Sequence, residues 1–407
     1  MTPNGVSLGG TNEGGICMKK SILALLVAAF AFAAAGTGGA STQSPKAAGT
    51  ALLKCGKTRS LGLLAPITGP AASLGAEQVK WFKYYISRYN KTHKKTKFKA
   101  AYGDTILAGP GGTAEAVKAA ATVSSISSVL ALVGPAGSNE VIATTPTIKN
   151  AGLGFVSGSA TRTTLTTDGQ RTGFFFRTVP PDSVQGTAVA NFIITRQKYK
   201  RVYIIDDQEA YSTGLADFVQ AKLKAANVTV GRDGVSQQQS DFSALIAKIP
   251  HNTQLVYLPW QVADKAKAFA DQMKSGGRAG IKLMGSDGLF DSSFASVGSH
   301  VYDSNFPLNP KSKIISGFKK IHGGDGEYFG APTYAATQVV GTAIDRVCAR
   351  GSATRAAVRA AIRSTKIPAA KSLIGVAIRY NRNGDLSTLK KFGLYKSNGS
   401  VFVPIAG

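Results

Sequence analysis

Apolar runs typical of β-strands alternate with amphipathic runs typical of helices along most of the 407-residue chain. The first strands are expected at residues 60–65, 98–102 and 129–133, with helices at 76–90 and 113–125 between them. Two strands separated by one helix lie side by side and parallel, because the helix returns the chain to the edge where the first strand began. The alternation therefore predicts an α/β fold built on doubly wound parallel sheets.

Two segments rich in structure-breaking residues interrupt this series, at Val179-Pro-Pro-Asp-Ser183 and Asp303-Ser-Asn-Phe-Pro-Leu-Asn-Pro310. The chain is also longer than one ordinary hydrophobic core supports. We interpret the breakers as crossings of a multi-strand hinge between two lobes, an arrangement that can close on a ligand. Lobe 1 is predicted to comprise residues 55–178 with 304–387, and lobe 2 residues 179–303 with 388–407.

The same alternation continues to the end of the chain. Ala336, Val340, Ala343 and Val347 share one face of an expected helix at 331–350, which indicates close packing on the first sheet. The other expected helices lie at 184–196, 212–226, 242–248, 263–275, 311–321 and 354–365, and the other expected strands at 153–156, 174–178, 201–206, 228–235, 254–258, 281–284, 374–380 and 390–396.

The N-terminus has the three parts of a secretory signal. Met18-Lys-Lys is positively charged, residues 22–35 are apolar and uncharged, and Gly38-Gly-Ala40 offers a small-residue cleavage site. We predict a signal peptide with an upstream extension over residues 1–40, and then a linker over 41–54. The mature protein is expected to be secreted, in the periplasm or the cell envelope. No lipid anchor is expected, because the residue before Cys55 is a lysine.

Cys55 and Cys348 are the cysteines of the predicted mature chain. An even pair in an exported protein predicts a disulfide. The alternative is two unrelated cysteines, one near a frayed terminus and one in a helix.

The formal charge of +26 is unusually basic, and residues 80–99 contain eight Lys or Arg and no acid. Nucleic-acid binding would also require stacking aromatics on a platform or a recognition motif. The aromatics of this segment, among them Trp81 and Tyr85, repeat at helical spacing and are expected to face a core. We predict no nucleic-acid partner. We interpret the Lys and Arg residues of this segment as the solvated face of the helix. Weak attachment to an anionic wall polymer or membrane surface is the second interpretation of the charge.

Motifs of enzymes and cofactor sites do not assemble in this sequence. The four histidines are scattered without the spacing of metal ligands, and Gly56-Lys-Thr58 lacks the upstream glycine of a phosphate-binding loop. The serine elbow of hydrolases is also missing. We therefore expect no catalytic residue, no metal and no cofactor, and a binding protein rather than an enzyme.

Two hydroxyl-rich turns follow neighbouring predicted strands. They are Gly134-Pro-Ala-Gly-Ser-Asn139 and Ser157-Gly-Ser-Ala-Thr161, and both should emerge at the carboxyl edge of the sheet, where open α/β sheets bind ligands. Free backbone N–H groups and hydroxyls at helix starts suit a small anion such as a carboxylate. Ser138 and Thr161 could instead be ordinary helix caps.

The order of several motifs resembles the leucine/isoleucine/valine-binding-protein family, which comprises type I periplasmic binding proteins of ABC transporters. The resemblance covers nearly the whole predicted mature chain. It is carried by Ala65-Pro-Ile-Thr-Gly-Pro-Ala-Ala-Ser-Leu-Gly75, Val133-Gly-Pro-Ala-Gly-Ser138, Ser157-Gly-Ser-Ala-Thr161, Phe176-Arg-Thr-Val-Pro180, Asp206-Asp-Gln-Glu-Ala-Tyr211, Val256-Tyr-Leu-Pro-Trp-Gln261, Gly285-Ser-Asp287 and Asn383-Gly-Asp-Leu386.

The resemblance implies a set of ligand-binding residues. The carboxylate-binding serine falls on Ser138, and the Ala/Thr loop on Ser159, Ala160 and Thr161. The aromatic residue of the second lobe matches Tyr211, and the acidic partner of the ligand ammonium matches Asp287. The sequence departs from the family at Gln261, with Trp260 beside it, where a second tyrosine is usual, and at Leu74, where an aromatic is common.

The predicted function is that of a monomeric extracytoplasmic solute-binding protein that captures a small amino acid or related carboxylate and delivers it to a membrane ABC permease. The alternative is a sensor of the same two-lobed form for amides, urea or aromatic acids.

Overall fold

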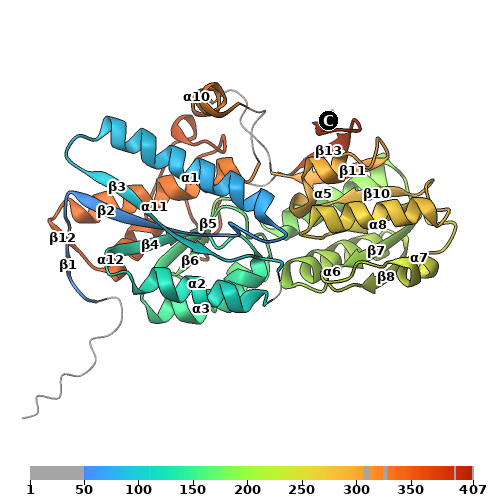
Figure 1. Cartoon of the computed structure of the whole chain (residues 1–407), viewed down its shortest axis with the longest axis horizontal. Helices are drawn as coiled ribbons and strands as arrows, with labels where there is room; N and C mark the ends of the chain where they lie inside the picture. The colour runs from blue at the N-terminus through green and yellow to red at the C-terminus, as the bar shows by residue number, and fades with distance from the viewer. Residues whose placement is uncertain (1–49, 110, 307–311, 324–327, 389–390, 406–407) are drawn as a thin grey trace, which may run out of the picture. The chain divides into compact units, whose positions relative to one another are not determined.

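The computed structural model describes residues 50–405 except 110, 307–311, 324–327 and 389–390 (Figure 1). The predicted signal peptide and residues 41–49 of the predicted linker lie outside the described residues. Within the described part, no helix combines the length and the apolar character needed to cross a membrane.

The first sheet has five parallel strands in the order β3-β2-β4-β5-β6. The strand order reverses between β2 and β4, which makes a switch point where a ligand can bind beyond the carboxyl ends of the strands. The predicted doubly wound sheet is therefore confirmed. The strands are β2 (Thr58–Ala65), β3 (Lys97–Asp104), β4 (Val129–Val133), β5 (Gly154–Ser157) and β6 (Phe175–Arg177).

Helices cover both faces of this sheet (Figure 1). The aromatic stripe of the basic segment is buried on one face, where Trp81 stacks on Phe318, so its predicted core role is confirmed. Ala336, Val340 and Ala343 are fully buried on the same face, as predicted. That face packs against α1 (Ala72–Thr92), α10 (Lys313–His322), α11 (Gly330–Cys348) and α12 (Arg355–Arg363), and the other against α2 (Thr113–Ser125) and α3 (Ser138–Asn150), with the short α4 (Thr164–Thr167) before β6.

The second sheet has seven strands in the order β14-β13-β11-β10-β9-β7-β8. The five from β8 to β11 are parallel, and their order reverses between β7 and β9, which repeats the switch point of the first sheet. The last two strands of the chain add antiparallel at one edge. The strands are β7 (Arg201–Asp206), β8 (Thr229–Gly234), β9 (Leu255–Leu258), β10 (Lys282–Gly285), β11 (Val301–Asn305), β13 (Gly393–Ser397) and β14 (Phe402–Pro404).

Two buried clusters flank the second sheet. Trp260, Phe269 and Phe294 belong to the cluster on one face, and Phe192 and Leu215 to the cluster on the other. The helices of the first face are α7 (Ser243–Lys248), α8 (Ala263–Ser275) and α9 (Ser292–Ala295), preceded by the 3-10 turn η2 (Asp287–Leu289), and those of the second are α5 (Asp182–Asn191), its π-helical continuation η1 (Phe192–Arg196) and α6 (Ala210–Ala225).

The strand predicted at 374–380 is wrong. In this segment Ile378 and Tyr380 make isolated bridges to Ile367 and Leu386 and extend no sheet. The segment is apolar because it packs on the first core: Ile374, Ile378 and Tyr380 are all buried there. Burial alone therefore produced the pattern that we interpreted as a strand.

The breaker predicted from residue 303 begins inside a strand, and this is a second correction. β11 is completely buried and pairs with strands on both sides, although it ends in Asp303, Ser304 and Asn305. Polar residues of this kind are depleted in strands, which concealed the element in the sequence.

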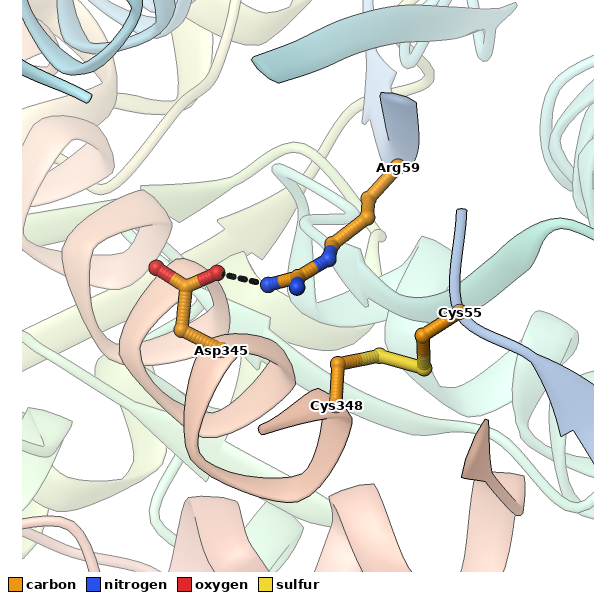
Figure 2. Close-up of a disulfide and its surroundings, with 4 residues drawn as sticks. All are labelled: Cys55, Arg59, Asp345 and Cys348. Atoms are coloured by element: carbon orange, nitrogen blue, oxygen red, sulfur yellow. Dashed lines mark hydrogen bonds and ion pairs between the residues drawn. A yellow bond between two sulfur atoms is a disulfide. The ribbon is translucent and has the colours of Figure 1, made fainter. Parts of the chain in front are cut away.

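The predicted disulfide joins Cys55 to Cys348 at the end of α11, with a Cα–Cα distance of 5.5 Å (Figure 2). Beside it Arg59 of β2 forms an ion pair with Asp345 of α11. The end of the predicted linker also belongs to this corner, because β1 (Leu53–Lys54) pairs with β12 (Ser352–Ala353). The disulfide prediction is confirmed, and the bond links the start of lobe 1 covalently to the end of α11.

Candidate functional site

The segments that follow the strands at both switch points meet at one small cavity of about 20 Å³, which we call the inner cavity. From the first sheet it receives the first turn of α1, the loop after β3 and the turns after β4 and β5, and from the second the segments after β7, β9 and β10. Its lining residues are Leu74, Leu107, Ala136, Gly137, Ser138, Ser159, Tyr211, Gln261, Asp287, Gly288 and Phe329. The cavity is therefore built from both lobes.

Six residues named by the sequence line this cavity: Leu74, Ser138, Ser159, Tyr211, Gln261 and Asp287. Ala160 and Thr161 are buried in the turn that follows Ser159 but do not line it. Trp260 lies in the core of lobe 2, where its indole N–H donates to Ile205 O at 2.7 Å and its ring packs against Phe242 and Phe269. The structure therefore does not bring Trp260 to the cavity.

The two hydroxyl-rich turns of lobe 1 contact each other. The Ser138 hydroxyl accepts a hydrogen bond from Arg162 N at 3.1 Å, and the Ser159 hydroxyl donates to Ala136 O at 2.8 Å. Gln78 of α1 donates to the same Ser159 hydroxyl at 3.0 Å. The polar groups on this wall are thus held in place by their own lobe.

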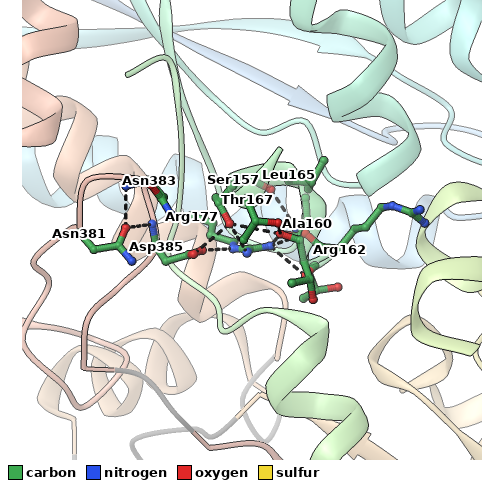
Figure 3. Close-up of polar contacts among 12 residues, drawn as sticks. Ser157, Ala160, Arg162, Leu165, Thr167, Arg177, Asn381, Asn383 and Asp385 are labelled. Carbon is green, nitrogen blue, oxygen red and sulfur yellow. Dashed lines mark hydrogen bonds and ion pairs between the residues drawn. The ribbon is translucent and has the colours of Figure 1, made fainter. Parts of the chain in front are cut away.

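Arg177 fixes the second of these turns from behind (Figure 3). Its side chain is fully buried and donates to Thr161 O at 2.8 Å and Arg162 O at 2.9 Å. Its Nε donates to Asp385 Oδ1 at 2.6 Å, and Nη2 donates to Thr166 Oγ1 at 2.8 Å. Two motifs far apart in the sequence, Phe176-Arg177 and Gly384-Asp385, therefore meet to hold one turn.

Glu140 supports the first turn in a similar way. Its Oε2 accepts a hydrogen bond from Gly137 N at 2.9 Å, at the start of α3. The side chain is completely buried, and burial raises the pKa of its carboxyl to about 7 against the opposing effect of that hydrogen bond. Glu140 thereby shapes the backbone that carries Ser138.

The wall from lobe 2 carries the charge of the site. The Tyr211 hydroxyl donates to Asp287 Oδ1 at 2.6 Å and lies 2.7 Å from Ser286 Oγ. Burial raises the pKa of Asp287 to about 6, although the hydrogen bonds from Tyr211 and Gln185 oppose the shift. A carboxylate in this position favours a cationic partner.

A second buried carboxyl, Asp182 at the start of α5, lies close to the first. Neither of its oxygens makes a hydrogen bond of normal geometry within the described structure. Burial raises its pKa to about 7, with the neighbouring Asp287 carboxylate adding to the shift and Thr161, Arg177 and Arg162 opposing it. Asp182 was not among the predicted site residues, because its Pro-rich segment predicts only a hinge crossing.

Contacts between the lobes flank the cavity. Asn139 Nδ2 donates to Glu209 Oε2 at 3.0 Å, and Arg162 donates to Ala210 O at the start of α6. Two further lining residues that the sequence did not identify, Leu107 and Phe329, are buried and apolar and gave no polar signal.

Two doubly wound lobes with a small cavity between their switch points define the class of type I two-lobed binding proteins. The chain belongs to the periplasmic binding protein family, whose model matches residues 58–388. This family is extracytoplasmic, and the predicted resemblance and the predicted solute-binding function are confirmed.

Individual relatives agree with this assignment. A Leu/Ile/Val-binding protein, BraC3, of Rhizobium johnstonii is 29% identical over 349 residues, which is 83% of this chain and 90% of the relative. The leucine-binding protein LivK of Thermotoga maritima has the same fold, with a TM-score of 0.75 at 22% identity over 86% of this chain and 98% of that one. LivJ of Streptococcus pneumoniae, solved in complex with isoleucine, has a TM-score of 0.72 at 19% identity over 86% and 100% of the two chains.

Proposed function

We propose that the protein captures an α-amino acid or a related small carboxylate between its lobes and delivers it to an ABC permease in the membrane. The observation that carries the proposal is the inner cavity, where Ser138 and Ser159 of one lobe face Tyr211 and Asp287 of the other. A zwitterion has one group for each wall.

The wall from lobe 1 suits the carboxylate. Ser138 stands at the start of α3, where backbone N–H groups without helical partners and the positive end of the helix dipole favour an anion. Ser159 adds a hydroxyl from the neighbouring turn.

The wall from lobe 2 suits the ammonium. Asp287 lines the cavity with Tyr211 and Gln185 as neutral hydrogen-bond partners, so a ligand cation would offset the charge of this buried carboxylate. A ligand that contacts both walls stabilises the closed arrangement over any open one, because only the closed one offers all of these contacts.

The relatives support an amino acid and a transport role. BraC3 is named for leucine, isoleucine and valine, and the LivJ structure contains isoleucine. The buried carboxyls argue against the alternative of a sensor for aromatic acids, because an anionic ligand would face Asp287 without compensation.

We further infer that the predicted signal peptide exports the protein, and that it binds ligand as a monomer without chemical change. Both lobes of one chain supply the lining of the inner cavity, so no second copy is needed to complete it.

The substitution Asp287→Asn tests the proposal. Removing one member of a buried charge pair costs about 2–5 kcal/mol, so amino-acid affinity measured by calorimetry should fall by roughly thirtyfold to several thousandfold. Asp207→Asn is the matched control, because Asp207 is equally buried in lobe 2 but does not line the inner cavity. Unchanged affinity in Asp287→Asn would exclude an ammonium partner at this position.

A further inference from the structure

A larger cavity of about 320 Å³, which we call the outer cavity, adjoins the inner cavity. The two cavities share the lining residues Leu74, Gln261, Gly288 and Phe329. Ser138, Ser159, Tyr211 and Asp287 line only the inner one. An amino acid held by its α-carboxylate and α-ammonium in the inner cavity would therefore direct its side chain past the shared residues into the outer cavity.

The charged residues that line the outer cavity are all acidic. They are Glu77 of α1, Asp264 in the first turn of α8, and Asp291 at the start of α9, and no Lys, Arg or His lines this cavity within the described part of the chain. The chain as a whole has 48 Lys and Arg against 22 Asp and Glu, so a set chosen by chance would be mostly basic. The cavity thus has the opposite sign to the protein that surrounds it.

Local structure explains part of this set. Asp291 Oδ1 caps α9 by accepting from Ser293 N at 2.8 Å, and acidic residues such as Asp264 are favoured in the first turn of a helix. A hydrogen bond from an N–H group leaves the carboxylate charged, and neither Asp264 nor Asp291 forms an ion pair with a described residue. Helix capping therefore accounts for their positions and leaves their charge available.

The remaining lining suits a chain with a polar end. Gln261 lines both cavities and is only 7% exposed. Its Oε1 accepts a hydrogen bond from Gln237 Nε2 at 3.3 Å, whereas its own Nε2 makes no hydrogen bond to a described residue. Phe290 and Phe329 supply apolar faces beside the carboxylates. Methylene groups can pack on such rings, and a cation near a ring face is attracted to it.

The α-ammonium of a ligand would offset only one of the acidic groups along this path. Asp287 stands at the inner end, and Asp264 and Asp291 at the outer end. A cavity lined by one sign of charge focuses the potential and concentrates ligands of the opposite sign.

We propose that the preferred ligand is an α-amino acid with a second positive charge at the end of its side chain, which lies in the outer cavity beside Asp264 and Asp291. This inference rests on the proposed function, since it requires that the α-groups bind in the inner cavity.

L-Lysine and L-norleucine test the inference, because norleucine has the same chain length as the first four side-chain carbons of lysine but no terminal ammonium. Calorimetry on the purified protein should show lysine binding about tenfold more tightly than norleucine, which is the preference expected from two partly exposed charge pairs. Salt should weaken lysine binding and leave norleucine binding unchanged.

The double substitution Asp264→Asn and Asp291→Asn should remove most of this preference while norleucine affinity stays constant. Asparagine still caps a helix, so α9 keeps its start. Asp271→Asn, on the same helix as Asp264 but outside the cavity, is the matched control and should keep the preference for lysine.

The outcomes separate the two proposals. Norleucine binding as tightly as lysine, or a lysine preference that survives the double substitution, would overturn the inference and leave amino-acid binding standing. Binding of neither ligand, nor of leucine, would contradict the proposed function itself.

Discussion

The two walls of the inner cavity differ in how completely the protein satisfies their polar groups. On the wall from lobe 1, the Ser138 and Ser159 hydroxyls already have hydrogen-bond partners in their own lobe. On the wall from lobe 2, Asp287 has Tyr211 as a neutral partner, and the nearby Asp182 accepts no hydrogen bond of normal geometry from a described residue. The hydroxyls that line the first wall are therefore paired dipoles, and the second wall carries a carboxylate.

Because of this difference, the two lobes are expected to contribute to ligand binding in different ways. Preorganised dipoles hold a ligand without reorganising, whereas a buried carboxylate without a cation is unfavourable until a ligand arrives. We therefore expect lobe 1 to determine how the α-carboxylate is oriented, and lobe 2 to couple ligand binding to charge and pH.

Arg177→Met should have the largest effect on stability, because it removes the side chain that supports the Thr161 turn in the wall from lobe 1. Loss of one partner from a buried ion pair typically destabilises by about 3–5 kcal/mol, and Asp385 would remain without its cation. Chemical denaturation should show this loss, and ligand affinity should fall as the turn of Thr161 relaxes. Arg232→Met is the control: Arg232 is 21% exposed and contacts Asp206 and Asp217, so its loss should cost about 1 kcal/mol. Equal losses in both variants would mean that the Arg177 network adds no support.

Reduction of the disulfide should affect lobe 1 more than lobe 2, because both cysteines lie in the corner where β1, β12 and α11 meet. Opening a native disulfide typically costs about 2–4 kcal/mol. The chain has two tryptophans, Trp81 in the core of lobe 1 and Trp260 in the core of lobe 2, so single-tryptophan variants report each lobe by fluorescence.

The midpoint of unfolding reported by Trp81 should fall on reduction, and the one reported by Trp260 should fall less. Protein purified without reductant should also have no free thiol. Two titratable thiols before reduction, or an unfolding midpoint reported by Trp81 that reductant leaves unchanged, would contradict this prediction.

Acidification should affect the empty and the liganded protein in opposite directions. Because the folded-state pKa values of Asp287 (about 6) and Asp182 (about 7) are raised, the stability that these groups contribute is complete below their unfolded pKa and is lost as the pH rises through 6–7. The melting temperature of the empty protein should therefore rise as the pH falls from about 8 to 5. Amino-acid affinity should weaken by up to about tenfold per pH unit below the pKa of Asp287, because the ammonium loses its ionised partner.

The control for this experiment is again Asp287→Asn, which removes the contribution of lobe 2 at that position and keeps Glu140 of lobe 1, whose pKa is about 7. Its melting temperature should depend less steeply on pH than that of the parent. A ligand affinity that is constant between pH 7 and pH 5 in the parent protein would mean that Asp287 is not the ammonium partner.

Most regular elements were predictable because their periodicity follows from one buried face. The helices at 113–125 and 263–275 and the strands at 129–133 and 201–206 have the predicted bounds. Prediction failed where burial and secondary structure do not coincide. Residues 374–380 are buried without being a strand, and β11 is a buried strand that ends in polar residues.

The residues of the candidate site could likewise be predicted only in part. Ser138, Ser159, Tyr211 and Asp287 were found by their order in the chain and by the family resemblance, and the structure places all four at the inner cavity. Trp260 was named because it adjoins Gln261 in sequence, but successive residues at the end of a strand point in opposite directions, and its indole turned into the core.

The sequence by itself determined the strand–helix alternation, the pair of cysteines and the residue types that follow each strand, because these depend on local periodicity and composition. Only the tertiary structure decided which of those residues face one another. It brought Arg177 to Asp385 across 208 positions of sequence, placed Asp182 near Asp287, and gathered Glu77, Asp264 and Asp291 around one cavity. Charge compensation in a folded protein depends on distance in space, which no spacing along the chain specifies.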